Sequence, residues 1–269
     1  MKVIAITSGK GGVGKTSLSA NLAIALAGRD QRVTVFDADI GLANLDVMLG
    51  RPAKGTMQEV LSGAKTIADV LEDGPGGIKF VGGGSGIETL INLTNRAGDA
   101  FLRQITELEK TTDFLIFDTG AGIDANVMAF LTAATEVFVV ITPDPASLTD
   151  GYATAKAIIL EDPSVVVKVL MNMVDDEAQG KAVFARLTSI SQQFLGVPLA
   201  YAGHVRVDAK AARCVRQRKP WMLADPHLPA SRDVDRIAAG ILGEAVSPSS
   251  GSTSFAERLR GVFAKNKAA

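Results

Sequence analysis

Two glycine-rich patterns overlap near the amino terminus, and both are patterns that bind phosphate groups. The stretch SGKGGVGKT (8–16) holds four glycines and two lysines and follows the apolar run VIAI. Its glycines fit the G-x-G-x-x-G turn of dinucleotide-binding folds at Gly9, Gly11 and Gly14. The stretch also fits G-x-x-x-x-G-K-[ST], which adds Lys15 and Thr16. A nicotinamide dehydrogenase would leave both additions unexplained, so the sequence favours a triphosphate-binding loop.

Each residue type in this loop has a chemical role. Glycines let successive backbone N–H groups point at a polyphosphate, and the positive end of a following helix adds to their attraction. Lys15 can reach the β- and γ-phosphates, and the Thr16 hydroxyl can ligate Mg²⁺. The loop therefore predicts a nucleoside triphosphate and Mg²⁺ as cofactors, and the resemblance given below implies that the triphosphate is ATP. The predicted binding residues of the loop are Gly9, Lys10, Gly11, Gly12, Val13, Gly14, Lys15, Thr16 and Ser17.

Carboxylates follow two apolar runs at the positions where predicted strands end. Asp118 closes FLIFD, and a phosphate loop needs such an acid beside it to hold the water shell of the metal. The stretch FDAD supplies Asp37 and Asp39, of which one could orient the attacking water and the other could support the metal or the loop. For all three residues the alternative is a turn or capping role.

The predicted strands and helices that must position these groups alternate along the chain. Apolar strands separated by helices predict a mainly parallel, twisted α/β sheet with helices on both faces, in three layers. The expected strands are 3–6, 33–36, 78–81, 114–117, 137–141 and 165–170. The expected helices are 15–27, 99–109, 125–133, 148–159, 180–194 and 232–242.

Composition restricts the function classes. The chain has 269 residues and 28 Lys and Arg against 29 Asp and Glu, so a net charge of −1 provides no general attraction to nucleic acid. Its only cysteine, Cys214, cannot form an internal disulfide, and no secretory signal or apolar span is present. These features favour the cytoplasm. They also fit one catalytic domain (1–246) with a small appendage.

The appendage begins with the small polar stretch SPSSGST, which predicts a flexible linker over 247–253. The segment 254–269 then places apolar residues on one face of a helix and cations around it. Such a helix can bind the inner surface of a membrane, although it can also dock on the main domain. The candidate membrane residues are Phe255, Leu259, Val262 and Phe263.

A second basic segment, KAARCVRQRKPW (210–221), carries five cations beside Trp221. It could contact nucleic acid without sequence preference, but the neutral balance of the whole chain favours a solvated helix face.

Four blocks of the sequence together resemble the MinD/ParA family of ATPases with a deviant Walker A loop. They are SGKGGVGKT, DADIGLANLDVMLG, DTGAGID and TPDPASLTDGYATAK, within residues 2–242, and they look most like the flagellar-number regulator branch called FlhG or FleN. The resemblance implies a P-loop NTPase fold. Regulators of that branch often begin with a segment that stimulates a partner GTPase, whereas here Met1 and Lys2 lead directly into the first strand, which puts that activity in doubt.

The resemblance also implies roles for individual residues. The lysine at the position of Lys10 reaches across a dimer to phosphates held by the other subunit. Asp39 matches the aspartate that positions the hydrolytic water, Asp118 the Walker B acid, and Asn172 the residue that contacts adenine. Without the resemblance, Lys10 could be a solvated cation and Asn172 a cap at a strand end.

The resulting expectation is a Mg-ATP-dependent ATPase that dimerises on ATP and associates reversibly with the cytoplasmic membrane. It would act as a regulator of flagellar number or placement, or of the cell-division site, with a protein partner that stimulates hydrolysis. The alternative is a ParA-type partitioning ATPase whose ATP dimer coats DNA.

Overall fold

One twisted sheet organises the whole chain. The computed structural model describes residues 1–39, 44–84, 95–243 and 254–268. Within these residues the strand order is β3-β4-β2-β5-β1-β6-β7-β8, and every neighbouring pair is parallel except β3 and β4. The strands are β1 (Lys2–Ser8), β2 (Val33–Ala38), β3 (Glu72–Asp73), β4 (Lys79–Val81), β5 (Phe114–Ala121), β6 (Glu136–Ile141), β7 (Val166–Val174) and β8 (Ala200–Arg206).

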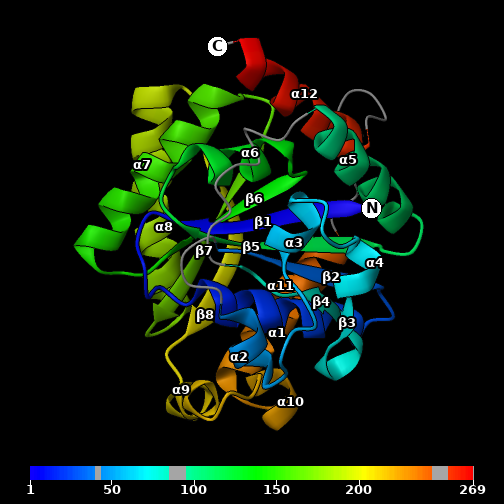
Figure 1. Cartoon of the computed structure of the whole chain (residues 1–269). Helices are drawn as coiled ribbons and strands as arrows, with labels where there is room; N and C mark the ends of the chain where they lie inside the picture. The colour runs from blue at the N-terminus through cyan, green and yellow to red at the C-terminus, as the bar shows by residue number, and fades with distance from the viewer. Residues whose placement is uncertain (40–43, 85–94, 244–253, 269) are drawn as a thin grey trace.

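Helices cover both faces of the sheet (Figure 1), as the alternating pattern predicted. One face carries α3 (Met57–Leu61), α4 (Ile67–Val70), α5 (Asn95–Glu109), α6 (Ala125–Ala133), α7 (Pro145–Glu161), α8 (Glu177–Leu195) and α12 (Phe255–Ala268). The other face carries α1 (Lys15–Ala27), α2 (Leu45–Leu49), α9 (Ala209–Arg216), α10 (Trp221–Ala224) and α11 (Pro229–Gly243). Central strands are therefore buried on both sides, which explains why β6 is apolar almost throughout.

The three-layer α/β prediction is confirmed, and the differences lie at the periphery. The strand β8 was not expected because AYAGHVR lacks a continuous apolar run, and its outer position leaves Ala200 exposed. The short helices α2 to α4 and α10 were also not assigned from the pattern, whereas α9 agrees with the helix face expected within 210–221. Parallel strands bring their carboxyl ends to one edge, and the loop after β1, the acids after β2 and β5, and the end of β7 meet there.

The carboxyl-terminal helix lies against the body of the protein. The Phe255 ring packs on Phe117 of β5 with ring centroids 5.6 Å apart, and Leu259 is fully buried. Val262 and Phe263 are partly buried against the same core. The apolar face of α12 therefore packs on the main domain, which was the second of its two predicted partners. It covers an apolar surface formed by α5 and α6.

Two features of the helix fix this position. The amide N–H of Ala256 donates to Oε1 of Glu109 at 3.3 Å, and Nη2 of Arg258 donates to Oγ1 of Thr135 at 3.0 Å. Burial lowers the pKa of Arg258, and nearby Glu109 partly offsets the effect. The predicted linker 247–253 lies outside the described residues. Among those that are described, no helix has the length and apolarity needed to cross a membrane.

Candidate functional site

The glycine-rich loop joins β1 to α1 in a conformation that only glycine allows. Gly14 immediately precedes α1 with φ at +92°, and a Cβ there would lie 2.6 Å from Nδ2 of Asn172. A Cβ on Gly9 would lie 2.3 Å from the carbonyl oxygen of Asp150 in α7. Gly11 and Gly12 face open space. The loop is thus packed against its surroundings at both ends, and its middle is left open to a ligand.

Lys15 is the buried cation of the site. Its ammonium donates to Oγ of Ser8 at 2.9 Å. Burial lowers its pKa, while the charges of Asp118 and Asp39 act in the opposite direction. Because the amino end of α1 adds positive potential at the same point, an anion that approached the loop would stabilise this cation.

Asp118 lies behind the first turn of α1. It accepts a hydrogen bond from Oγ of Ser19 at 2.9 Å and another from the hydroxyl of Thr16. Burial raises its pKa to about 6, although these two hydrogen bonds and Lys15 oppose the rise. The predicted pair of metal-associated residues, Thr16 and Asp118, is therefore brought into contact.

Asp37 organises the loop that follows β2. Its carboxylate accepts the backbone N–H groups of Asp39 and Asn44 at 3.0 Å each and of Leu45 at 3.1 Å. Burial, together with the charge of Asp118, raises its pKa to about 7 despite these hydrogen bonds. Of the two roles that the sequence left open for this acid, its contacts fit support of the loop.

Asp39 and Lys10 lie nearer the surface of the site. Asp39 lines the cleft above the phosphate loop, where a Cβ on Gly120 would be 3.3 Å from its Oδ1. Lys10 is 46% exposed, and its ammonium is 3.5 Å from Oδ1 of Asp144, the residue that caps α7. Hydrogen bonds from Thr142 and Ser147 lower the pKa of Asp144, and Lys10 adds to the effect.

A cleft of about 940 Å³ extends from the loop toward the ends of β7 and β8. Nδ2 of Asn172 donates to the carbonyl oxygen of Val13 at 2.7 Å, which ties β7 to the loop. We call the part of the cleft beyond Asn172 the base lobe. The base lobe is lined by aliphatic groups, the backbone after β8 and three arginines, from Met173, Val205, Arg206, Val207, Asp208, Ala211, Ala212, Val215, Arg216, Arg218, Trp221 and Ala230.

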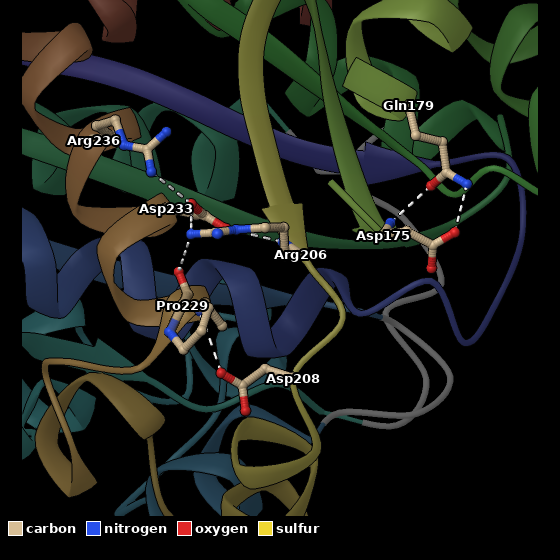
Figure 2. A network of polar contacts seen from close by, with 8 residues as sticks. Asp175, Gln179, Arg206, Asp208, Pro229, Asp233 and Arg236 are labelled. Carbon is tan, nitrogen blue, oxygen red and sulfur yellow. Dashed lines mark hydrogen bonds and ion pairs between the residues drawn. The ribbon is translucent and has the colours of Figure 1, made fainter. Parts of the chain in front are cut away.

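Charged groups fix the wall of the base lobe (Figure 2). Arg206, at the end of β8, donates to both oxygens of Asp233 in α11 at 2.8 Å each. Asp233 has no exposed side-chain surface and also accepts from Arg236 at 2.9 Å. Asp208 caps α9 by accepting two of its backbone N–H groups. The wall is therefore held by partners outside the cleft.

The residues present fit a magnesium–nucleoside triphosphate complex. An open glycine cradle and a buried cation suit the phosphates, and a hydroxyl next to a carboxylate suits a hard divalent ion. The raised pKa values of Asp37 and Asp118 also fit, because burial disfavours both anions, and the charge of Asp118 at Asp37 and of Asp39 at Asp118 adds to the effect until a divalent cation is nearby. Together with the parallel sheet, these features define a P-loop NTPase.

Comparison with known proteins gives the family. The family model ParA, described as "NUBPL iron-transfer P-loop NTPase", matches residues 1–242. The chain is 38% identical over 238 residues to antiactivator FleN of Pseudomonas aeruginosa, covering 88% of this chain and 85% of that protein. It is 37% identical over 265 residues to flagellum site-determining protein YlxH of Helicobacter pylori, covering 96% and 89%. The chain thus belongs to the ParA/MinD family of P-loop NTPases and is an ATPase.

Solved structures agree on the fold. The septum site-determining protein MinD of Pyrococcus horikoshii OT3, complexed with Mg-ADP, superimposes with a TM-score of 0.72 at 22% identity, over 93% of this chain and 98% of that one. The family assignment also favours the phosphate-loop pattern over the dinucleotide pattern that fits the same glycines.

Sequence reasoning identified the loop but missed several of its partners. The structure places most of the predicted loop residues in one cleft with Asp39 and Asn172, with Asp118 directly behind the loop, whereas Val13 is buried in the core. The helix α12 lies elsewhere, on α5 and α6. The missed side chains are Ser8, Ser19 and Asp144. Only Asp144 had a readable local signal, because an acid before a proline is typical of a helix start.

Proposed function

We propose that the chain is a Mg-ATP-dependent, dimerising switch that regulates the number or placement of flagella. The observation that carries the proposal is the phosphate loop with two differently placed lysines, one buried against the loop and one on its outer surface. The names of the relatives, an antiactivator and a flagellum site-determining protein, supply the biological process.

Hydrolysis requires groups that hold the triphosphate, orient water and stabilise developing charge. The backbone N–H groups of the loop and Lys15 would bind the phosphates, and the Thr16 hydroxyl and Asp118 would hold the metal, the latter through water. Bound Mg²⁺ neutralises charge on the phosphate oxygens. Asp39, on the cleft wall, orients the attacking water for in-line displacement. Asp37 maintains the loop that carries Asp39.

The exposure of Lys10 supports a contribution in trans. Its side chain leaves the loop toward solvent, and its ion pair with Asp144 is weak enough for a phosphate of a second subunit to replace it. We expect Lys10→Ala to stay monomeric with ATP when the parent chain dimerises, as measured by light scattering. The matched control is Lys181→Ala, which removes an exposed, ion-paired lysine of α8. Normal dimerisation of Lys10→Ala would refute the role.

Asp39 gives an independent test of the catalytic assignment. Asp39→Ala is expected to bind ATP and to accumulate as a dimer, because binding and dimer formation remain possible while hydrolysis slows. Phosphate release under single-turnover conditions measures the step. A variant that hydrolyses ATP at the parent rate would remove Asp39 from the mechanism.

Membrane association through α12 is the second part of the proposal. The docked helix must leave α5 and α6 before Phe255 and Leu259 can enter a lipid interface, and two tails on one dimer would strengthen weak individual binding. The test is co-sedimentation with anionic liposomes, with ATP or ADP, of the full chain and of a chain lacking 254–269. Equal sedimentation of both chains would exclude a membrane role for the helix.

A second candidate function is non-specific DNA binding. All five cations of the basic segment are exposed on and after α9: Lys210, Arg213, Arg216, Arg218 and Lys219. Trp221, which lies beside them in sequence, is only 5% exposed and packs in the core. Salt-sensitive DNA binding by the chain lacking 254–269 would favour this function, and its absence would favour the membrane.

A further inference from the structure

A hydroxyl of α1 that lies outside the phosphate-loop motif contacts the metal-associated acid. Ser19 has no exposed surface, and its Oγ lies 2.9 Å from Oδ1 of Asp118 and 3.0 Å from the carbonyl oxygen of Lys15. A serine inside a helix commonly donates to the carbonyl four residues earlier, which here is that of Lys15. The contact with a carboxylate of β5 is additional to that local bond, and it joins the helix to the sheet.

Helix geometry places a second hydroxyl beside the first. Thr16 and Ser19 are three residues apart, so they lie on one face of α1, and this face is turned toward β5. Thr16 also donates a hydrogen bond to Asp118. Two hydroxyls of one helix therefore hold a single carboxylate, while the part of the loop that faces open space lies before them, at Gly11 and Gly12.

Burial makes these two contacts decisive for the orientation of the carboxylate. Asp118 is 1% exposed, so water offers its oxygens few alternative donors. The residues opposite it on the neighbouring strands are Ile6 of β1 and Asp37 of β2, and neither side chain is a donor when Asp37 is ionised. Among the described residues, the side chains that donate to Asp118 are Thr16 and Ser19.

We propose that Ser19 is a positioning residue, which holds the Asp118 carboxylate in the orientation that receives Mg²⁺. The proposal rests on the proposed function in one respect, that Thr16 and Asp118 hold the metal. Ser19 touches neither the metal nor the nucleotide in this role and acts only through Asp118. Removing such an outer partner of a metal site commonly lowers metal affinity about 10-fold to 100-fold. The role therefore affects binding of Mg²⁺ and leaves binding of the triphosphate itself unchanged.

Ser19→Ala tests the role, because alanine suits a helix and the change removes only the hydroxyl. Calorimetry compares ATP binding in EDTA with ATP binding over a series of Mg²⁺ concentrations. The Mg²⁺ concentration that gives half of the full enhancement should rise about tenfold, and binding in EDTA should stay within about twofold of the parent chain. Equal losses with and without Mg²⁺, or an unchanged Mg²⁺ dependence, would overturn the proposal.

The parent chain distinguishes failure of this proposal from failure of the proposed function. If the parent chain binds no ATP, the proposed function fails. If it binds ATP with no response to Mg²⁺, the metal role of Asp118 fails, and the role of Ser19 fails with it. A parent chain that responds to Mg²⁺ while Ser19→Ala responds identically contradicts only the role of Ser19.

Conservative variants separate the hydroxyl from packing. Ser19→Thr keeps the hydroxyl and adds one methyl group, so its Mg²⁺ dependence should stay close to that of the parent chain even if the methyl group lowers the melting temperature. Ser19→Cys has a similar size and is a weaker donor, so it should lie between the parent chain and Ser19→Ala. If Ser19→Thr and Ser19→Cys both need as much Mg²⁺ as Ser19→Ala, the hydroxyl is not the determinant.

A double substitution tests whether Ser19 acts through Asp118. In an Asp118→Asn background, Ser19→Ala should cause no further change in Mg²⁺ dependence, because the carboxylate that it positions is already absent. The matched control is Ser189→Ala in α8, which removes a hydroxyl that donates to the carbonyl of Ala185 at 2.8 Å and should behave like the parent chain. A further tenfold rise in the Asp118→Asn background would refute action through Asp118.

Discussion

The docking of α12 makes a quantitative prediction for Leu259→Ala. Leu259 is fully buried where α12 packs on the body, next to Phe255, whose ring contacts Phe117. The substitution removes most of the Leu259 side chain from that contact and leaves the hydrogen bonds of Ala256 and Arg258 in place. It should therefore weaken docking and leave the helix sequence otherwise intact.

The size of the effect follows from burial. Complete burial of Phe255 and Leu259 contributes about 3–6 kcal/mol before the cost of ordering the helix. A Leu→Ala change at a fully buried site costs about 2–5 kcal/mol, which raises the detached-to-docked ratio roughly 30-fold or more. Since one substitution removes a large share of the total, a substantial detached population is expected.

Hydrogen exchange with mass spectrometry measures this population. Amides of α12, and those of α5 beneath it, should lose protection in Leu259→Ala, while β1 and β5 keep theirs. Arg260→Ala is the matched control, because Arg260 is an exposed residue of the same helix. If Leu259→Ala and Arg260→Ala exchange alike in α12, docking through Leu259 is refuted.

Two further predictions concern the site. Asp144→Asn removes the charge that holds Lys10 in each subunit, so ATP-dependent dimerisation measured by light scattering should become more favourable. Weaker dimerisation would contradict this. Asp118→Asn should stabilise the nucleotide-free chain by up to about 3 kcal/mol at pH 8 and very little at pH 4. The raised pKa of about 6 means that the folded state retains a proton that the unfolded state releases near its ordinary pKa of 3.8, so stability falls as pH rises between these values. Thermal unfolding at both pH values measures it, and an equal effect at both would refute the assignment.

The phosphate loop could be predicted because its determinants are adjacent in sequence. Glycine spacing, Lys15 and Thr16 all act within one turn between a strand and a helix, and α1 has the predicted bounds. The parallel sheet was predictable for a similar reason, since strands buried on both faces must be apolar throughout. The strand β8 could not be predicted in this way, because it lies at one edge of the sheet and needs no continuous apolar run.

The contacts that complete the site depend on tertiary register. Ser19 reaches Asp118 and Asn172 reaches Val13 only after β1, β5 and β7 are aligned. The positive φ of Met173 occurs at a register shift between two strands, of which one was not expected. Pattern reasoning gave the chemistry of the loop, whereas the partners that orient it required the assembled fold.

The carboxyl-terminal helix shows why an amphipathic pattern does not identify its partner. The same four residues satisfy a membrane interface or a groove on α5 and α6, and they cannot occupy both at once. If detachment costs about 3 kcal/mol, the apparent membrane affinity falls roughly 100-fold relative to a free helix. A nucleotide-driven dimer could overcome this cost by presenting two helices together.

This competition predicts that a change in the body, outside the helix, will increase membrane binding. Glu109 of α5 accepts the Ala256 amide and lies near Arg258, so Glu109→Ala weakens docking and leaves the tail sequence unchanged. Loss of one such hydrogen bond costs about 1 kcal/mol, so liposome binding should rise about fivefold. Leu259→Ala detaches the helix too but removes a group that lipid would bind, so its binding should rise less. If Glu109→Ala leaves sedimentation unchanged while hydrogen exchange shows that α12 has loosened, docking and membrane binding do not compete for the same face.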